Sequence, residues 1–175
     1  MYNAFTGLCT PGSYLKTGTF GAALAPTTTE GDLFAPAACD TNDGFTFVTS
    51  GTLSACIKVS SVPMTYSNAH AHCLSLGAHL YVSRSIERFY LLPGSLVYII
   101  GLTDLAKEGI FVWEDNGYVI TESLKSSLFE PGEPNNSNSN EDCVIVVFWG
   151  LGIFAKDYAC EGNEFQFVCE RPLVL

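Results

Sequence analysis

Basic residues are scarce in this chain of 175 residues, which has 8 lysines and arginines against 18 aspartates and glutamates and a formal net charge of −10. A surface that binds nucleic acid or anionic lipid needs an excess of basic side chains. The composition therefore argues against both as partners. An excess of carboxylates suits a hard divalent cation such as calcium instead, provided that several oxygens converge on one point.

Long apolar runs are also missing. The most apolar uncharged stretches are residues 89–103, which Pro93 and Gly94 interrupt, and residues 143–155. A membrane-spanning helix needs about 20 consecutive apolar residues, so no membrane span is predicted in this chain. The first residues, Met1-Tyr2-Asn3, lack the basic and apolar regions of a signal peptide.

No Cys-x-x-Cys pair occurs among the seven cysteines, so zinc ribbons and thioredoxin-like redox sites are poorly supported. Dispersed cysteines in an acidic chain with few lysines favour disulfides, and with them an oxidising compartment. Buried free thiols in a cytosolic protein are the alternative. Because seven is odd, one thiol is left over if all the others pair.

The chain divides by composition at about residue 38. Residues 1–38 are rich in glycine, proline and threonine without a sustained period, and we interpret them as a linker or stalk. An irregular lobe that packs through its aromatic side chains is the alternative. Residues 39–175 have the pattern of a globular domain.

Two helices are expected early in this domain. Thr65 is a good N-cap and Gly77 a good residue to follow the last turn, so a helix is predicted between them. Its buried face would carry Ala69, Cys73 and Leu76.

A second helix is predicted to begin after Ser83 or Ser85 and to end at Pro93-Gly94, with Ile86, Phe89 and Tyr90 turned inward. Strands are then expected at residues 97–102, 110–113, 143–148, 152–155 and 165–170. Helices followed by short strands indicate an α+β fold with an antiparallel sheet.

A long polar stretch between Leu124 and Asp142 holds most of the chemistry. Glu133, Asn135 and Glu141 offer carboxylate and amide oxygens within nine residues, and Asp157 follows later in the chain. Calcium takes six to eight such oxygens. An acidic loop taken alone is more often simply solvated, so the spacing of these residues decides the interpretation.

That spacing resembles the C-type lectin domain over about residues 56–172. The segments that carry the resemblance are Glu133-Pro134-Asn135, Glu141-Asp142-Cys143, Asp157-Tyr158-Ala159-Cys160, residues 74–80 after Cys73, Ile100-Gly101-Leu102, Trp113-Glu114-Asp115-Asn116-Gly117, Phe129-Glu130-Pro131-Gly132 and Val168-Cys169-Glu170. Ile99 and Phe129 stand where the family usually has tryptophan. The resemblance implies the C-type lectin fold, with a long loop that binds calcium and sugar.

The resemblance also implies the disulfide pairs Cys73–Cys169 and Cys143–Cys160. Cys39 and Cys56 would form the additional N-terminal bridge of long-form members, which leaves Cys9 to link two chains. The alternative is that Cys9 pairs with Cys39 and Cys56 stays free.

In such domains one calcium ion and two vicinal sugar hydroxyls share the same side chains, which correspond here to Glu133, Asn135, Glu141 and Asp157. The triplet Glu-Pro-Asn, with a cis Glu-Pro bond, implies a preference for mannose, glucose or N-acetylglucosamine. A neighbouring auxiliary calcium site corresponds to Asp104, Glu108, Asn136 and Asp142, with Asn136 in place of a carboxylate. Asp104 and Glu108 could otherwise be ordinary surface charges.

Lys156 departs from the family, which has asparagine at this position of the sugar site. A unit charge about 4 Å from a divalent cation is repelled by about 8 kcal/mol at an effective dielectric constant of 20. The ammonium group could turn to solvent. It could instead be the counter-ion of Glu133, Glu141 and Asp157, in a calcium-independent module that binds a protein or another non-sugar ligand.

An enzyme is not expected. Glu133 and Glu141 as a glycosidase pair would need an apolar pocket to separate their pKa values, and His70 and His72 do not share a helix face. We therefore expect a secreted or cell-surface protein that binds glycans in a calcium-dependent way. Because single sugar sites bind weakly, we expect assembly through the N-terminal segment or Cys9.

Overall fold

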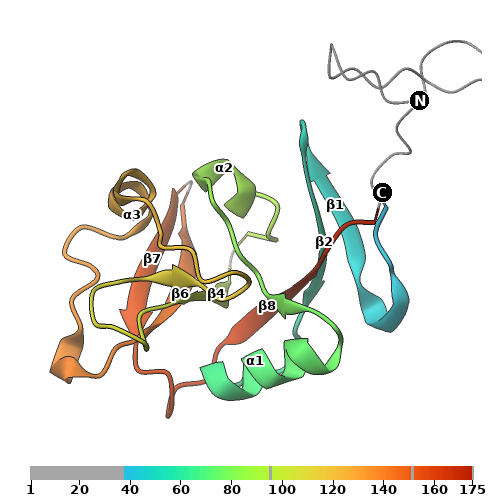
Figure 1. Ribbon diagram of the computed structural model, residues 1–175. Helices are drawn as coiled ribbons and strands as arrows, with labels where there is room; N and C mark the ends of the chain where they lie inside the picture. Colours follow the sequence, from blue (N-terminus) through green and yellow to red (C-terminus); the bar gives the residue numbers. More distant parts are fainter. Residues whose placement is uncertain (1–37, 95, 151, 175) are drawn as a thin grey trace, which may run out of the picture. The chain divides into compact units, whose positions relative to one another are not determined.

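The computed structural model describes residues 38–94, 96–150 and 152–174 (Figure 1), which all belong to one unit, Phe34–Leu175. The predicted linker, apart from Ala38, and Cys9 lie outside the described residues. In chain order the elements are η1 (Asn42–Gly44), β1 (Thr46–Ser50), β2 (Leu53–Val59), α1 (Tyr66–Ser75), β3 (His79–Leu80), α2 (Ile86–Phe89), β4 (Val97–Thr103), β5 (Val112–Trp113), α3 (Glu122–Leu128), η2 (Ser137–Ser139), β6 (Cys143–Trp149), β7 (Gly152–Tyr158) and β8 (Gln166–Arg171).

The strands form an eight-stranded sheet in the order β1-β2-β8-β4-β6-β7, with β3 paired to β8 and β5 to β4. All the strand pairs are antiparallel except β4 and β8, which are parallel. The α+β fold is therefore confirmed, although the sheet is mixed rather than purely antiparallel. The parallel pair arises because β8 returns from the far end of the domain and inserts between β2 and β4.

Helix α1 forms where its capping residues predict it. Thr65 is extended at the N-cap, and Gly77 adopts a φ of +65° after the last turn, which suits glycine. Ala69 and Cys73 are fully buried, as predicted, whereas Leu76 is half-buried at the C-cap.

The second helix is shorter than predicted, and the prediction that Tyr90 points inward is wrong. Helix α2 ends at Phe89, which is buried, and Tyr90 is 56% exposed. The N–H groups of Tyr90, Leu91 and Leu92 each bond three residues back rather than four. Pro93 disfavours the helical conformation of the residue before it, so the chain tightens here and turns Tyr90 outward.

The predicted elements did not include helix α3 or strands β1 and β2, although the family resemblance implied an N-terminal hairpin with a disulfide. Helix α3 lies in the region read as a loop, where the Thr121 hydroxyl caps it by accepting a hydrogen bond from the Leu124 N–H at 3.3 Å. Leu124 and Leu128 bury the inner face of this helix. The hairpin formed by β1 and β2 adds an edge to the sheet.

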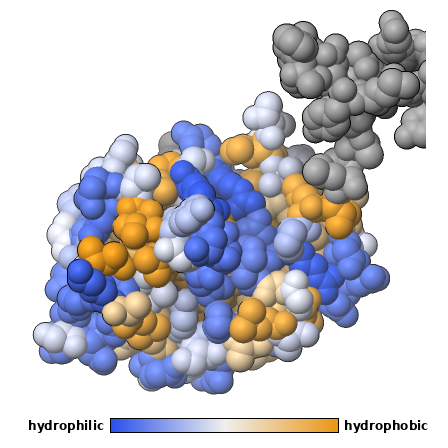
Figure 2. Space-filling model, viewed as in Figure 1, coloured by the Kyte–Doolittle hydropathy of each residue, from blue (hydrophilic) through white to orange (hydrophobic). Residues whose placement is uncertain are grey.

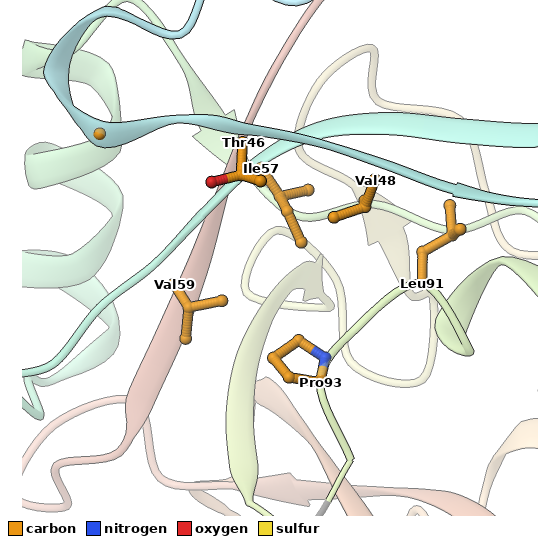
Figure 3. Close-up of a pocket in the computed structure, with 7 residues that line it drawn as sticks. Thr46, Val48, Ile57, Val59, Leu91 and Pro93 are labelled. Atoms are coloured by element: carbon orange, nitrogen blue, oxygen red, sulfur yellow. The ribbon is translucent and has the colours of Figure 1, made fainter.

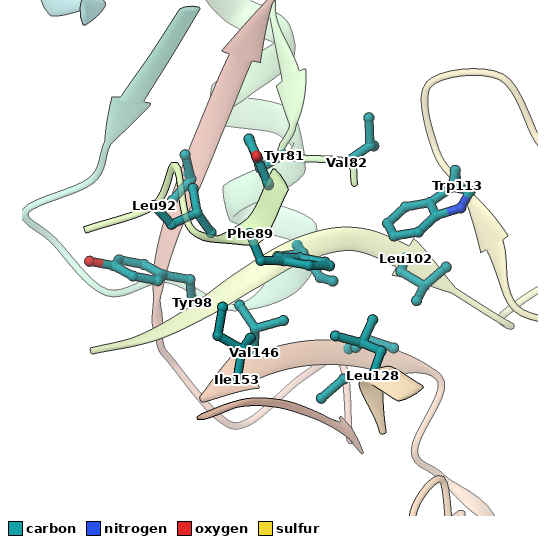
Figure 4. Packing of buried hydrophobic residues seen from close by; sticks show 14 of the residues in the cluster. Tyr81, Val82, Phe89, Leu92, Tyr98, Leu102, Trp113, Leu128, Val146 and Ile153 are labelled. Carbon is teal, nitrogen blue, oxygen red and sulfur yellow. The ribbon is translucent and has the colours of Figure 1, made fainter. Parts of the chain in front are cut away.

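A large hydrophobic cluster lies between the sheet and helices α2 and α3 (Figure 4). Trp113, Tyr81, Tyr98 and Phe89 are its largest fully buried side chains. A second cluster packs α1 against β4 and β8 around Ile99 and Phe167. Outside the core, apolar residues form separate patches among hydrophilic ones on the face that Figure 2 shows.

Three disulfides cross-link the described part of the chain. They join Cys39 to Cys56, Cys73 to Cys169 and Cys143 to Cys160, which are the pairs that the family resemblance implies. The last one ties the start of β6 to the chain just after β7. In the described part of the chain, no helix has the length and apolar character needed to cross a membrane.

Candidate functional site

Asp157 lies at the centre of the predicted site. Strand β7 holds it opposite Val144 of β6, and it is only 5% exposed. Its two carboxylate oxygens accept the backbone N–H groups of Asn135 at 3.0 Å and Asn136 at 2.7 Å. The structure thus brings the polar loop against β7, although the residues are more than 20 positions apart in the sequence.

The path of the loop explains this contact. Phe129 forms a parallel bridge with Ala155, and the N–H of Glu130 donates to the Ala155 carbonyl at 3.0 Å. The loop therefore leaves α3 along β7 and reaches Asp157 at Asn135, five residues after Glu130. The Glu133–Pro134 peptide bond in between is cis.

Glu133 and Asn135 form one side of the site. The Asn135 side-chain amide donates to the Glu133 carboxylate at 2.5 Å. Burial, followed by the neighbouring Asp157 carboxylate, raises the pKa of Glu133. Two carboxylates are therefore held close together, and a cation between them would relieve their repulsion.

Asn136 connects the two predicted ligand sets. Its side-chain amide donates to Glu108, while its side-chain oxygen accepts the N–H of Glu141 at 3.0 Å. The Glu141 carboxylate in turn accepts the N–H of Ser137 at 2.8 Å. Glu141 is therefore turned toward the backbone of η2.

Asp104 is the most buried charged residue of the site, with 1% exposure. One of its oxygens accepts the Gly109 N–H at 2.8 Å, whereas Oδ1 is buried and has no hydrogen-bond partner among the described residues. Burial raises the pKa of Asp104, and Asp142 and Asp157 contribute in the same direction. A buried oxygen without a partner needs an explanation, and a bound calcium ion would supply one.

Asp142 is positioned beside Asp104 by its backbone. The carbonyl of Asp142 accepts the Thr103 hydroxyl at 2.6 Å and the Asp104 N–H at 3.0 Å. Electrostatic interactions with Asp104 and Asp142 also raise the pKa of Glu108, after a larger effect of burial. Asp104, Glu108, Asn136 and Asp142 therefore form a connected second group around the end of β4.

Lys156 pairs directly with Glu130 rather than with Glu133, Glu141 or Asp157, although it also interacts electrostatically with Glu133. Its ammonium group forms an ion pair with Glu130, and its side chain is 39% exposed. The hydrogen bond to Glu130 raises the pKa of Lys156. Successive side chains of a strand point to opposite faces, so Lys156 and Asp157 diverge. Glu130 could not be predicted as the partner from the sequence, because nothing in its spacing singles it out.

Among the described residues, no three His, Cys, Asp or Glu side chains stand close enough together to make a metal site by themselves. The side-chain amides of Asn135 and Asn136 separate the carboxylates and donate to two of them. Each amide also carries an oxygen. The available donors are thus a mixed set of carboxylate and amide oxygens, which matches the ligand chemistry of calcium.

Comparison with known proteins identifies the family. Residues 62–171 match the model of the family described as "Lectin C-type domain", and the chain belongs to this family. Its members are lectins and receptors rather than enzymes. The chain is 35% identical over 119 residues to the human "C-type lectin domain family 4 member K" and 34% identical over 122 residues to the chicken "Hepatic lectin".

These two alignments cover 66% and 67% of this chain, but only 35% and 55% of the human and chicken proteins, respectively. Among solved structures, the C-type lectin domain of murine dendritic cell inhibitory receptor 2, in complex with N-glycan, is 26% identical with a TM-score of 0.58, and the match covers 70% of this chain and 94% of that one. A calcium-independent type II antifreeze protein has a TM-score of 0.59 at 20% identity, with 73% and 92% covered, and shares the fold.

Proposed function

We propose that this domain binds sugars through calcium, with Glu133, Asn135, Glu141 and Asp157 as ligands of the ion and of two vicinal hydroxyls. One observation carries the proposal: the Asp157 carboxylate accepts hydrogen bonds from the backbone N–H groups of Asn135 and Asn136, and Asn135 also contacts Glu133. Bound calcium would neutralise these carboxylates and polarise the hydroxyls that it coordinates. The Glu-Pro-Asn triplet favours mannose, glucose or N-acetylglucosamine.

Asp104, Glu108, Asn136 and Asp142 are proposed to hold the auxiliary calcium ion. The partnerless oxygen of Asp104 supports this assignment. The solved relative that carries an N-glycan supports a glycan as the ligand class. The disulfides support a secreted or cell-surface location, and residues 1–38 remain a proposed linker that precedes the domain.

Affinity chromatography tests the proposal. The protein should be retained on mannose-agarose in calcium and released by EDTA, and a galactose-agarose column should retain it less. A Glu133→Gln variant should lose retention, whereas Glu164→Gln, on the turn before β8, should keep it. Retention that survives EDTA would contradict a role for calcium, and a folded protein that binds neither column would contradict the mannose-type preference.

A calcium-independent module is the second candidate, and Lys156 is the observation that favours it. An ammonium group is present at the position where the family has a neutral ligand. Its ion pair with Glu130 keeps the side chain against the protein surface instead of extended into solvent. Calcium titration calorimetry on Lys156→Asn separates the candidates. If Lys156 blocks the ion, the variant should bind calcium at least about tenfold more tightly than the parent. Lys58→Asn removes the same charge at β2 and is the control. Absence of calcium binding in both the parent and Lys156→Asn would favour the second candidate.

A further inference from the structure

The loop that holds the candidate site contains a further motif. Asn135-Asn136-Ser137 has the Asn-x-Ser spacing at which asparagine side chains accept N-linked glycans in secreted proteins. Of the nine asparagines in the chain, only Asn135 is followed two positions later by serine or threonine. The three disulfides support passage through an oxidising compartment, where secreted proteins are modified in this way.

The two groups that define the motif are accessible. Asn135 and Ser137 are both exposed, and the Ser137 hydroxyl takes part in one hydrogen bond among the described residues, which it accepts from the Asn138 amide at 3.4 Å. Asn136 between them has a φ of +43°, in the left-handed region that asparagine tolerates in turns. The motif therefore lies on an exposed turn.

The contacts that position the loop do not depend on the amide that would carry a glycan. The Asp157 carboxylate binds the backbone N–H groups of Asn135 and Asn136. An asparagine amide has two N–H donors, and the hydrogen bond from Asn135 to Glu133, at 2.5 Å, uses one of them. A sugar that replaces the other hydrogen leaves this bond and the side-chain oxygen in place.

We propose that Asn135 is the acceptor of an N-linked glycan and that this glycan closes the sugar site. In the reaction, Nδ2 of Asn135 forms a bond to the anomeric carbon of an oligosaccharide that is carried on a lipid diphosphate. The bond between that carbon and the diphosphate oxygen breaks. The lipid diphosphate leaves with the bonding electrons, and the amide nitrogen loses one proton.

The closure of the site rests on the proposed function and follows from the position of the attachment atom. Nδ2 of Asn135 is within hydrogen-bond distance of Glu133, a proposed ligand of calcium and of sugar hydroxyls. The first sugar of the attached glycan therefore lies beside that carboxylate, where a free sugar has to bind. Because an N-linked glycan is bulky, glycosylated copies bind no external sugar, and only unmodified copies are active.

The modification lies at one end of the sheet. Asn135 is bound to β7, whereas β1 lies at the opposite edge in the strand order. The hollow at that other end, between the β1–β2 hairpin and the chain after α2, shares no residue with the loop of Asn135, and its lining includes Val48, Val59 and Pro93 (Figure 3). A glycan on Asn135 is therefore attached beside the candidate site and away from this hollow.

Peptide mass spectrometry tests the acceptor without reference to sugar binding. The full chain is secreted from a eukaryotic host and treated with peptide N-glycosidase in heavy-oxygen water, which releases an N-glycan and leaves a heavy-oxygen aspartate in place of its asparagine. The label is expected at position 135 in the parent and in Ser137→Thr, which keeps the motif, but not in Ser137→Ala. A parent without the label at this position would overturn the proposal.

Mannose-agarose in calcium tests the closure. The parent made in the bacterial cytosol and refolded carries no N-glycan and should be retained, whereas secreted glycosylated copies of the parent and of Ser137→Thr should pass through. Secreted Ser137→Ala should be retained, because Ser137 binds Glu141 through its backbone N–H, which the substitution keeps. Circular dichroism verifies that each preparation is folded.

Retention of the glycosylated copies would overturn the closure of the site. If the unglycosylated parent and Ser137→Ala also pass through the column, the proposed sugar binding is contradicted, whereas a label at position 135 still supports Asn135 as the glycan acceptor. The two measurements therefore separate a failure of this inference from a failure of the proposed function.

Discussion

Glu114 packs directly over Gly101. A Cβ atom on Gly101 would lie 2.6 Å from Cγ of Glu114 and 3.0 Å from the Leu80 carbonyl oxygen. Glu114 cannot easily move away, because its carboxylate accepts the Leu80 N–H and the Tyr66 hydroxyl. Glycine at position 101 is therefore required by the close approach of β4 to a buried carboxylate.

The first prediction concerns this contact. Gly101→Ala should lower the free energy of unfolding by about 1–3 kcal/mol, the usual cost of overpacking. Denaturant unfolding measures the loss. In a Glu114→Ala background the same substitution should cost less, because the obstructing side chain is gone. An equal cost in both backgrounds would show that Glu114 is not the obstacle.

The second prediction concerns pH. Burial raises the pKa of Glu114, although His70, the Leu80 N–H, Tyr66 and His79 all act to lower it. Between pH 4.5 and the raised value, the carboxyl group of Glu114 is therefore protonated in the folded protein but ionised in the unfolded chain. This contribution to stability is complete below the ordinary glutamate pKa of 4.5 and is lost as the pH rises through the raised value.

Unfolding measured from pH 4 to 7 checks this sign. The stability of the parent relative to Glu114→Gln should fall as the pH rises, by at most about 1.4 kcal/mol per pH unit. Glu87 provides the contrast, since hydrogen bonds from its own N–H and from Ser85 lower its pKa. The stability of the parent relative to Glu87→Gln should instead fall as the pH decreases. A rise with pH for Glu114 would refute the burial argument.

The third prediction compares two arginine–carboxylate pairs. Arg88 binds Glu170, whose side chain is 8% exposed, and Arg84 binds Asp115 through two contacts of 2.8 Å at the surface. Removing one partner of a buried pair leaves an uncompensated charge and costs about 3–5 kcal/mol, whereas exposed pairs contribute about 0–1 kcal/mol. Arg88→Met should therefore destabilise the protein far more than Arg84→Met in denaturant unfolding. Similar losses for both would mean that solvent reaches Glu170.

The fourth prediction concerns Asp104. In EDTA, Asp104→Asn should raise the melting temperature or leave it unchanged, because it removes a buried charge whose Oδ1 has no partner. In calcium, the parent should be stabilised by the ion, and the variant should lose most of that shift. Differential scanning calorimetry measures both. Asp40→Asn, which lies far from the site beside Arg171, should keep the full calcium shift. An undiminished shift in Asp104→Asn would remove Asp104 from the proposed ion site.

Local signals in the sequence were enough to predict much of the fold. Thr65 and Gly77 delimit α1, and the uncharged runs at residues 97–102 and 143–148 became β4 and β6. Of the residues that the family resemblance singled out, Asn135 and Asn136 lie against Asp157, and Asn135 contacts Glu133. Helix caps, apolar runs and motif spacing depend only on residues that are near one another in the sequence or on the distances between them along the chain, so a single sequence is enough to detect them.

Other features depend on contacts that no local pattern records. Thr121 caps α3, but the helix is short and mostly polar. Its two buried residues, Leu124 and Leu128, are too few to produce a recognisable helical pattern of apolar residues, so the helix was not predicted. Tyr90 followed the helical pattern of Phe89, yet Pro93 shortened the helix and turned Tyr90 outward. The partner of Lys156 was also unpredictable, because Glu130 reaches it only through the bridge between Phe129 and Ala155.

The two hydrogen bonds that Asp157 accepts from the loop have a consequence for the energetics of binding. They fix the backbone of Asn135 and Asn136 through protein contacts alone. A loop that is already pre-organised loses little conformational entropy when a ligand arrives. Exchange of these two amide protons should accordingly be slow before any ligand is added, and ligand addition should change it little.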